Sequence, residues 1–287
     1  MKILVTGARG QLGHDVCREL ARRGYSRVCG IDINELDITC EEAVKKYIDD
    51  FRPDAVVHCA AYTAVDRAET DSELCRRVNA LGTKYLAEST AACGAKFLYI
   101  STDYVFDGTK EGEYFPDDER GPRSVYGATK AEGEDFVRSA SEKYFIVRTA
   151  WVFGQEGNHF VKTMLRLADT KKELSVVCDQ VGSPTYTAAL ASLLADMCES
   201  EKYGVYHATC EGFCSWYEFA LEIFRQAGKT VTVHAVTTEQ YRAMVSQQAV
   251  RPLNSKLNKD KLVEQGFSRL PSWQDALKSY FSELSEQ

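Results

Sequence analysis

A tyrosine and a lysine four positions apart, Tyr126 and Lys130, are the side chains of this sequence whose spacing best suits proton transfer. At this spacing two side chains share one face of a helix, so the ammonium can lie beside the phenol. A neighbouring ammonium lowers the pKa of a phenol from its usual value of about 10, because it stabilises the phenolate. The spacing also arises by chance, so it indicates chemistry only where other segments converge on it.

The segment "ISTDYVFDG" supplies a further polar group, the hydroxyl of Thr102. It follows a predicted strand at 96–101, and open α/β sheets bind their ligands at the carboxyl ends of their strands. A hydroxyl at this edge can donate a hydrogen bond to an oxyanion that develops as a ketone is reduced. Asp103 comes next, and a turn-forming aspartate and a functional carboxylate are equally consistent with its position.

A glycine-rich turn, "TGARGQLG", follows the first predicted strand and places Gly7, Gly10 and Gly13 as G-x-x-G-x-x-G. Glycines there permit a tight turn, close approach of the backbone to a pyrophosphate, and packing of the next helix on the strand. That helix presents free N–H groups and the positive end of its dipole to the anion. The turn therefore predicts a dinucleotide site.

The preference between NADH and NADPH stays open at the level of sequence. Asp32 ends the second predicted strand and favours a free 2′-hydroxyl, whereas Arg9 in the turn is placed to meet a 2′-phosphate. Asp37 is equally consistent with a cap of the helix predicted at 41–50. The other residues predicted to line the cofactor lie in the turn and after the second and third strands: Gln11, Leu12, Ile38, Cys59, Ala60, Ala61 and Thr63.

Alternating strand and helix patterns predict the elements that position these residues. The predicted strands are 2–6, 27–31, 55–58, 96–101 and 144–148, and the predicted helices are 11–23, 41–50, 71–93 and 125–141. This alternation predicts an α/β fold, a Rossmann-type doubly wound parallel sheet covered on both faces. Beyond residue 149 the predicted helices are 161–173, 187–199 and 215–228, the strands are 174–178 and 204–209, and loop signals extend over 237–265.

The alternation of strands and helices becomes less regular beyond residue 149, and this change predicts two domains. We expect a dinucleotide-binding domain over 1–148, to which parts of about 175–200 return, and a smaller α/β substrate-binding domain, mainly 149–287. The length of 287 residues is sufficient for both.

Composition narrows the function classes. Hydrophobic residues make up 44% of the chain, and no apolar run approaches the ~20 residues that span a bilayer. The first residues form a strand and turn instead of a signal peptide, so we expect a cytoplasmic protein. The net charge of −7 argues against nonspecific nucleic-acid binding. Ten dispersed cysteines predict reduced, mostly buried thiols, and five scattered histidines predict no metal site.

Several longer segments resemble a known family. "STDYVFDG", "YGATKAEGE", "VRTAWVFG", "DQVGSPT" and "RPLNSKL" are similar to motifs of the dTDP-4-dehydrorhamnose reductases, within the extended short-chain dehydrogenase/reductase superfamily. The resemblance implies NAD(P)H-dependent reduction of the 4-keto group of dTDP-4-dehydrorhamnose to dTDP-L-rhamnose. It implies that Tyr126 donates the proton, that Lys130 assists it and binds the nicotinamide ribose, and that Thr102 contacts the ketone oxygen.

The resemblance also implies sugar contacts for Asp103 and Trp151, although a core position is an equally good interpretation of Trp151. Arg251, in "VRPLNS", is a candidate clamp for the substrate diphosphate, and its ordinary interpretation is a solvated charge. Family members have been described with Mg²⁺ near a dimer interface. The sequence does not place those acidic ligands, so Mg²⁺ and a homodimer are implied by the resemblance alone.

Two alternatives stay open. A nucleotide-sugar epimerase or dehydratase uses the same scaffold, but 4,6-dehydration needs a pair of acid/base carboxylates, and Tyr104 stands directly after Asp103. A noncatalytic regulatory subunit, resembling the partner of a methionine adenosyltransferase, is the second. Retention of Thr102, Tyr126 and Lys130 argues against it.

Overall fold

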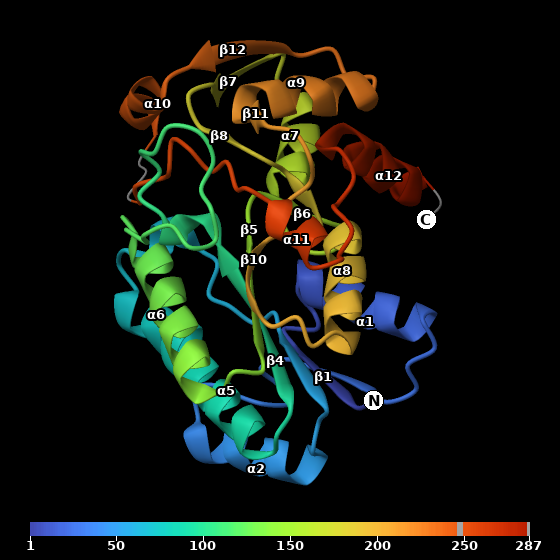
Figure 1. Cartoon of the computed structure of the whole chain (residues 1–287). Helices are drawn as coiled ribbons and strands as arrows, with labels where there is room; N and C mark the ends of the chain where they lie inside the picture. The colour runs from blue at the N-terminus through green and yellow to red at the C-terminus, as the bar shows by residue number, and fades with distance from the viewer. Residues whose placement is uncertain (246–248, 286–287) are drawn as a thin grey trace.

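A six-stranded parallel sheet forms the centre of the protein, as a computed structural model describing residues 1–245 and 249–285 shows (Figure 1). The order across the sheet is β10-β5-β4-β3-β1-β2. The predicted Rossmann-type α/β fold is confirmed, and the first five strands lie within one residue of their predicted bounds. The strands are β1 (Ile3–Thr6), β2 (Val28–Ile31), β3 (Ala55–His58), β4 (Lys96–Thr102), β5 (Tyr144–Thr149) and β10 (Gly204–His207).

Helices cover both faces of this sheet (Figure 1). On one face α1 (Gln11–Arg22) and α8 (Thr187–Glu199) pack together over Ile3 and Val5. On the other face, α2 (Glu41–Phe51), α5 (Gly82–Ala92) and α6 (Val125–Ala140) contribute to a second apolar cluster that contains Leu4 and Val56. Because successive side chains of β1 enter opposite clusters, its first three residues are all apolar.

The helix predicted at 71–93 is divided. After the short α3 (Val65–Ala68), the segment forms α4 (Ser72–Arg76), a π-helical turn η1 (Arg77–Leu81) and α5. Asn79 in this wide turn accepts the Tyr62 N–H at 2.8 Å and donates to the Tyr62 carbonyl at 3.1 Å. The turn thereby fixes the loop that follows β3.

The C-terminal half builds a second layer around three small two-stranded sheets, in the upper half of Figure 1. The predicted helix 161–173 is wrong at its end, because α7 stops at Ala168 and Glu173 already belongs to a strand. The elements are β6 (Val152–Phe153), α7 (Phe160–Ala168), β7 (Glu173–Val177), β8 (Val181–Gly182), β9 (Thr185–Tyr186), β11 (Cys214–Ser215), α9 (Trp216–Gln226) and β12 (Thr232–Val236).

The segment with predicted loop signals, 237–265, contains two short helices, α10 (Thr238–Met244) and α11 (Asp260–Glu264). Its residues 246–248 lie outside the described part of the chain. The chain then forms α12 (Trp273–Ser285), which packs beside β9. Strand β10 pairs with β5, so the second half of the chain also contributes a strand to the main sheet. The domain boundaries stay a prediction.

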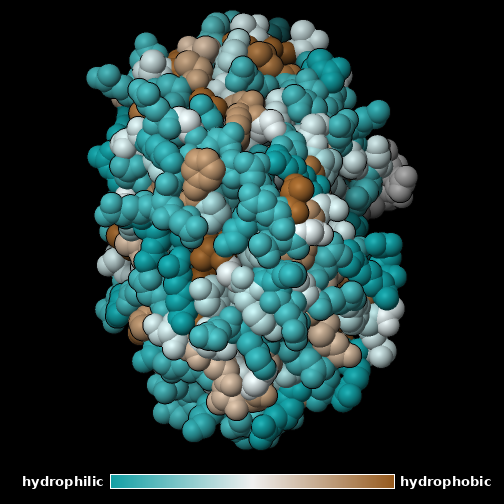
Figure 2. Space-filling view, viewed as in Figure 1, coloured by the Kyte–Doolittle hydropathy of each residue, from teal (hydrophilic) through white to brown (hydrophobic). Residues whose placement is uncertain are grey.

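The visible surface is mostly hydrophilic, with apolar side chains dispersed over it (Figure 2). Among the residues that the structure describes, no helix has the length and apolar character needed to cross a membrane. All ten cysteines are free thiols, but only four of them are buried: Cys75, Cys198, Cys210 and Cys214.

Candidate active site

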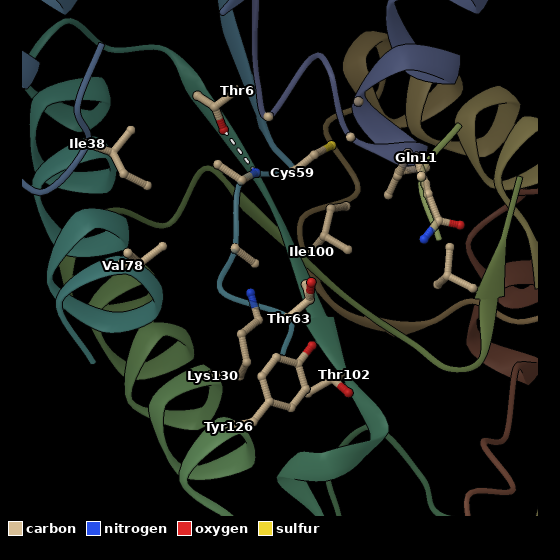
Figure 3. A pocket seen from close by; sticks show the side chains of 18 of the residues that line it. Thr6, Gln11, Ile38, Cys59, Thr63, Val78, Ile100, Thr102, Tyr126 and Lys130 are labelled. Carbon is tan, nitrogen blue, oxygen red and sulfur yellow. Dashed lines mark hydrogen bonds between the residues drawn. The ribbon is translucent and has the colours of Figure 1, made fainter. Parts of the chain in front are cut away.

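A cavity of about 960 Å³ lies where the strands of the main sheet end (Figure 3). Its walls come from the glycine turn, the segments after β2 and β3, the end of β4, the start of α6 and the segment after β5. All residues predicted to bind cofactor or to catalyse line it, as do Asp103 and Trp151. Arg251 does not belong to this lining. The sequence had not singled out Arg77, Tyr104 or Asn158, which also border the cavity.

The glycine turn leaves no room for side chains where a pyrophosphate is expected. Gly7 has a positive φ of 68°, and a Cβ there would lie 2.7 Å from the amide nitrogen of Ala60. A Cβ on Gly13 would lie 2.1 Å from the Gly7 carbonyl oxygen. Helix α1 begins directly after the turn without a side-chain cap, so N–H groups of its first turn are available to an anion. These residues fit a dinucleotide.

Three charged side chains, Arg9, Asp32 and Glu35, form a cluster at the edge of the cavity, and Arg9 and Asp32 belong to its lining. Asp32 accepts the backbone N–H of Arg9 at 3.1 Å and that of Ile33 at 2.9 Å. The Arg9 guanidinium is bonded to Glu35, and a Glu35 oxygen also accepts the Asp32 N–H at 2.9 Å. The arginine predicted to meet a 2′-phosphate is therefore already paired with an acid of the same chain.

Tyr126 and Lys130 project from one face of α6 toward the open space at the end of β4, where Thr102 lies (Figure 3). Helix α6 starts at a cap, because the Ser124 hydroxyl accepts the Gly127 N–H at 3.1 Å. The prediction that Tyr126 and Lys130 share one face of a helix is confirmed. Catalytic roles for these three side chains remain proposals.

Burial disfavours the ionised forms of both α6 side chains. It raises the pKa of Tyr126, with a smaller increase from the Asp103 carboxylate and an opposing hydrogen bond from Thr102. It lowers the pKa of Lys130 to about 7, against an opposing effect of Glu134. The Lys130 side chain is held over the Tyr99 ring, with Nζ 4.0 Å from the ring centroid. An ammonium in this position gains from any anion that binds in the cavity.

Thr102 and Asp103 form a polar pair at the end of β4. The Thr102 hydroxyl donates to a carboxylate oxygen of Asp103 at 2.9 Å, and the Ser255 hydroxyl donates to the other oxygen. Burial raises the pKa of Asp103 to about 6, although these hydrogen bonds oppose the increase. Asp103 thus faces the C-terminal segment as well as the cavity.

A buried ion pair supports the floor of the site. Glu134, fully buried on α6, accepts from Arg148 of β5 at 2.7 and 2.8 Å and from the Ser101 hydroxyl of β4 at 2.6 Å. Desolvation tends to raise the pKa of Glu134, but the Arg148 contacts prevail and lower it. One carboxylate therefore joins α6 to the two strands that end beside Thr102.

Tyr104 connects Tyr126 to a distant segment of the chain. Its ring meets Tyr126 edge-on, with centroids 5.5 Å apart and an interplanar angle of 80°. Its hydroxyl accepts from Arg251 at 3.0 Å, and Arg251 also pairs with Asp66 at 2.6 Å. Arg251 is thus bonded to two side chains of this chain. The ordinary interpretation of Arg251 as a solvated surface charge is therefore wrong. No sequence pattern indicated these contacts, because the partners lie far apart along the chain.

Trp151 combines features of both of its interpretations. It has a positive φ of 51°, which is unusual for a residue other than glycine and is often associated with functional sites. Its indole stacks on Trp216, with ring centroids 3.6 Å apart and an interplanar angle of 13°. It nevertheless borders the cavity. Within residues 1–245 and 249–285, no three His, Cys, Asp or Glu side chains form a group able to hold a metal ion.

Comparison with known proteins gives one consistent result. The family described as "RmlD substrate binding domain" matches residues 1–286. A dTDP-4-dehydrorhamnose reductase of Aggregatibacter actinomycetemcomitans is 44% identical, over 97% of each chain. The crystal structure of such a reductase from Bacillus anthracis, in complex with NADP, superposes with a TM-score of 0.94 at 42% identity, covering 99% of this chain and all of the other. One from Clostridium acetobutylicum gives 0.95 at 44% identity, with the same coverage.

Proposed function

The chain belongs to the RmlD substrate binding domain family, and we propose that it reduces dTDP-4-dehydrorhamnose to dTDP-L-rhamnose. It is an NAD(P)H-dependent oxidoreductase of dTDP-rhamnose biosynthesis. The observation that carries the assignment is the convergence of Thr102, Tyr126 and Lys130 on the cavity that contains the glycine turn. Reduction of a ketone needs a dinucleotide site and a proton donor in one crevice.

The side chains of this cavity account for the movement of the proton. Reduced nicotinamide supplies the hydride that reaches C4 of the sugar. The Tyr126 phenol gives its proton to the ketone oxygen, so that hydride and proton together yield the alcohol. The Lys130 ammonium stabilises the phenolate that remains. The Thr102 hydroxyl, bonded to Asp103 in this structure, turns to donate to the oxygen as negative charge develops.

The remaining assignments rest on position. Lys130 also binds the nicotinamide ribose, and the lining residues from the turn and from the segments after β2 and β3 hold the rest of the dinucleotide. Asp103 and Trp151, which line the same cavity, contact the sugar. Arg251 clamps the diphosphate after exchanging Asp66 for a phosphate group, a replacement that suits a guanidinium.

A direct assay tests the reaction. Purified protein is mixed with NADPH and dTDP-4-dehydrorhamnose, and the loss of reduced-cofactor absorbance is followed. We expect consumption with this substrate and none with dTDP-glucose, which has a hydroxyl at C4 in place of the ketone. A protein that is folded by circular dichroism and binds NADPH, yet consumes none with the keto sugar, contradicts the proposal. That outcome favours the epimerase, dehydratase or regulatory alternatives.

We also propose a cytoplasmic location, where NADPH and nucleotide sugars are supplied, and a homodimer, which the family resemblance implies. Sedimentation analysis in the presence and absence of Mg²⁺ tests the dimer and any contribution of the metal to it. A single monomeric species under both conditions contradicts the dimer.

A further inference from the structure

Three charged groups meet at the edge of the cavity: Arg9 in the glycine turn, Asp32 after β2, and Glu35 in the turn that follows, behind the lining. Glu35 makes two contacts, with the guanidinium of Arg9 and with the backbone N–H of Asp32. The turn itself is closed by hydrogen bonds from the N–H groups of Glu35 and Leu36 to the Asp32 carbonyl, both at 3.0 Å. Glu35 is thus held where it meets Arg9.

This cluster is accessible to a ligand. The side chain of Arg9 is 59% exposed and that of Glu35 is 38% exposed, and both Arg9 and Asp32 line the cavity. The hydrogen bond from the Asp32 N–H, followed by the contacts from Arg9, lowers the pKa of Glu35, so this acid is ionised at neutral pH. With two carboxylates and one guanidinium, the cluster has a net charge of −1.

We propose that Glu35 sets the preference of this protein between NADH and NADPH by holding the Arg9 guanidinium away from the 2′ position of the adenosine ribose. A 2′-hydroxyl donates a hydrogen bond and suits the Asp32 carboxylate. A 2′-phosphate is mostly a dianion at neutral pH, and it meets the repulsion of two acids unless Arg9 leaves Glu35 to bind it. Glu35 therefore disfavours NADPH without contacting either cofactor.

A second arginine borders the same cavity and must be distinguished from Arg9. Arg77, in the η1 turn, donates to the Thr39 hydroxyl at 3.2 Å, on the segment that follows Asp37. If Arg77 bound the 2′-phosphate instead, removing Glu35 would raise the affinity for NADPH only through the general loss of negative charge, with or without Arg9. The proposal thus predicts a gain in NADPH affinity that requires Arg9.

The test uses the full chain and measures dissociation constants for NADPH and NADH by fluorescence titration without sugar nucleotide. For Glu35→Gln we expect NADPH to bind roughly three- to tenfold more tightly, because an exposed guanidinium released from its partner gains a charge-assisted contact. The NADH constant should change little. For Glu35→Gln combined with Arg9→Gln, the gain in NADPH affinity should disappear.

A matched control is Glu41→Gln, which removes one exposed carboxylate from the first turn of α2 without touching Arg9. Three outcomes would overturn the proposal. NADPH affinity could rise equally in the control, the gain could persist without Arg9, or the ratio of NADPH to NADH affinity could stay unchanged in Glu35→Gln. The inference rests on the proposed use of NAD(P)H. Because sugar is absent from the titration, a failed reductase assay with normal cofactor binding would count against the reaction alone.

Discussion

At the scale of the residue, burial of Tyr126 and Lys130 disfavours both the phenolate and the ammonium. The protein thus places an acid and a base in surroundings that favour their neutral forms. A bound dinucleotide brings negative phosphates into the cavity, and these favour the ammonium. We infer that binding of the cofactor prepares Lys130 to assist Tyr126.

Replacing Tyr126 by Phe removes the hydroxyl and keeps the ring against Tyr104. We expect kcat/KM for the keto sugar to fall by about 10²- to 10⁴-fold, the usual contribution of general acid catalysis. The dissociation constant for NADPH should stay near that of the wild type, since Lys130 is retained. Near-normal turnover would show that another group donates the proton.

Asp103 should make stability depend on pH. Its folded pKa of about 6 lies above the usual value, so its contribution to stability is fully present below the unfolded pKa and is lost as pH rises through the folded one. Between pH of about 4 and 6 this loss is on the order of 2–3 kcal/mol. The loss should be absent in Asp103→Asn, as measured by urea unfolding across this range.

The control for this measurement is Asp49→Asn, on the exposed surface of α2. It should reproduce the wild-type dependence. A variant Asp103→Asn that follows the wild-type curve would mean that the carboxylate titrates normally despite its burial.

At the scale of the element, one buried carboxylate joins helix α6 to the central sheet. Glu134 joins it to Arg148 and Ser101, at the ends of β5 and β4. A buried ion pair contributes little net stability relative to apolar packing, but loss of one partner leaves an unpaired charge. We therefore infer that the ion pair of Glu134 and Arg148 mainly aligns α6 with the sheet, so that Tyr126 and Lys130 lie beside Thr102.

Glu134→Gln removes the carboxylate that pairs directly with Arg148. We expect a loss of about 3–5 kcal/mol in the free energy of unfolding, whereas Ser101→Ala, which removes one hydrogen bond, should cost about 1 kcal/mol. Because the folded pKa of Glu134 is lowered, its stabilisation is present above the unfolded pKa and lost as pH falls through the folded value. Urea denaturation of the variants at neutral and acidic pH measures both effects. A Glu134→Gln variant as stable as the wild type at neutral pH would contradict the expected cost of leaving Arg148 unpaired.

The main strands were predictable from sequence because their aliphatic runs, such as "AVVH" in β3, are buried on both faces. Two-residue strands such as β8 were not, because such a short segment has no periodicity and is defined by its partner. The glycine turn and the Tyr126 to Lys130 spacing predicted a shared cavity for the same reason that the strands were predictable: each is a local pattern. The pairing of Arg9 with Glu35, and of Arg251 with Asp66, depends on tertiary contacts between distant segments.

At the scale of the whole molecule, the chain leaves the central sheet after β5 and returns to it with β10. Helix α8 also returns, packing its Leu190 and Leu194 into the cluster with α1. The two halves therefore share one hydrophobic core. The sequence change near residue 149 marks a change of architecture, and we expect no independent folding unit to end there.

Truncation tests this expectation. A fragment of residues 1–148 lacks α8 and β10, so it exposes the apolar face of α1 and the outer edge of β5. We expect it to be aggregated or unfolded and to bind no NADPH, whereas the full chain should unfold in one cooperative transition by circular dichroism and by tryptophan fluorescence. A soluble, folded fragment that binds NADPH would contradict the shared core.

The return of β10 to the sheet also bears on how the protein is made. During translation, the strand that covers the edge of β5 leaves the ribosome only after the whole segment from β6 to α8 has been synthesised. The nascent dinucleotide-binding half must wait in an incomplete state, with an open strand edge and an uncovered helix face. Chaperones that shield such surfaces should therefore engage this chain during synthesis, and their release should follow emergence of Gly204–His207.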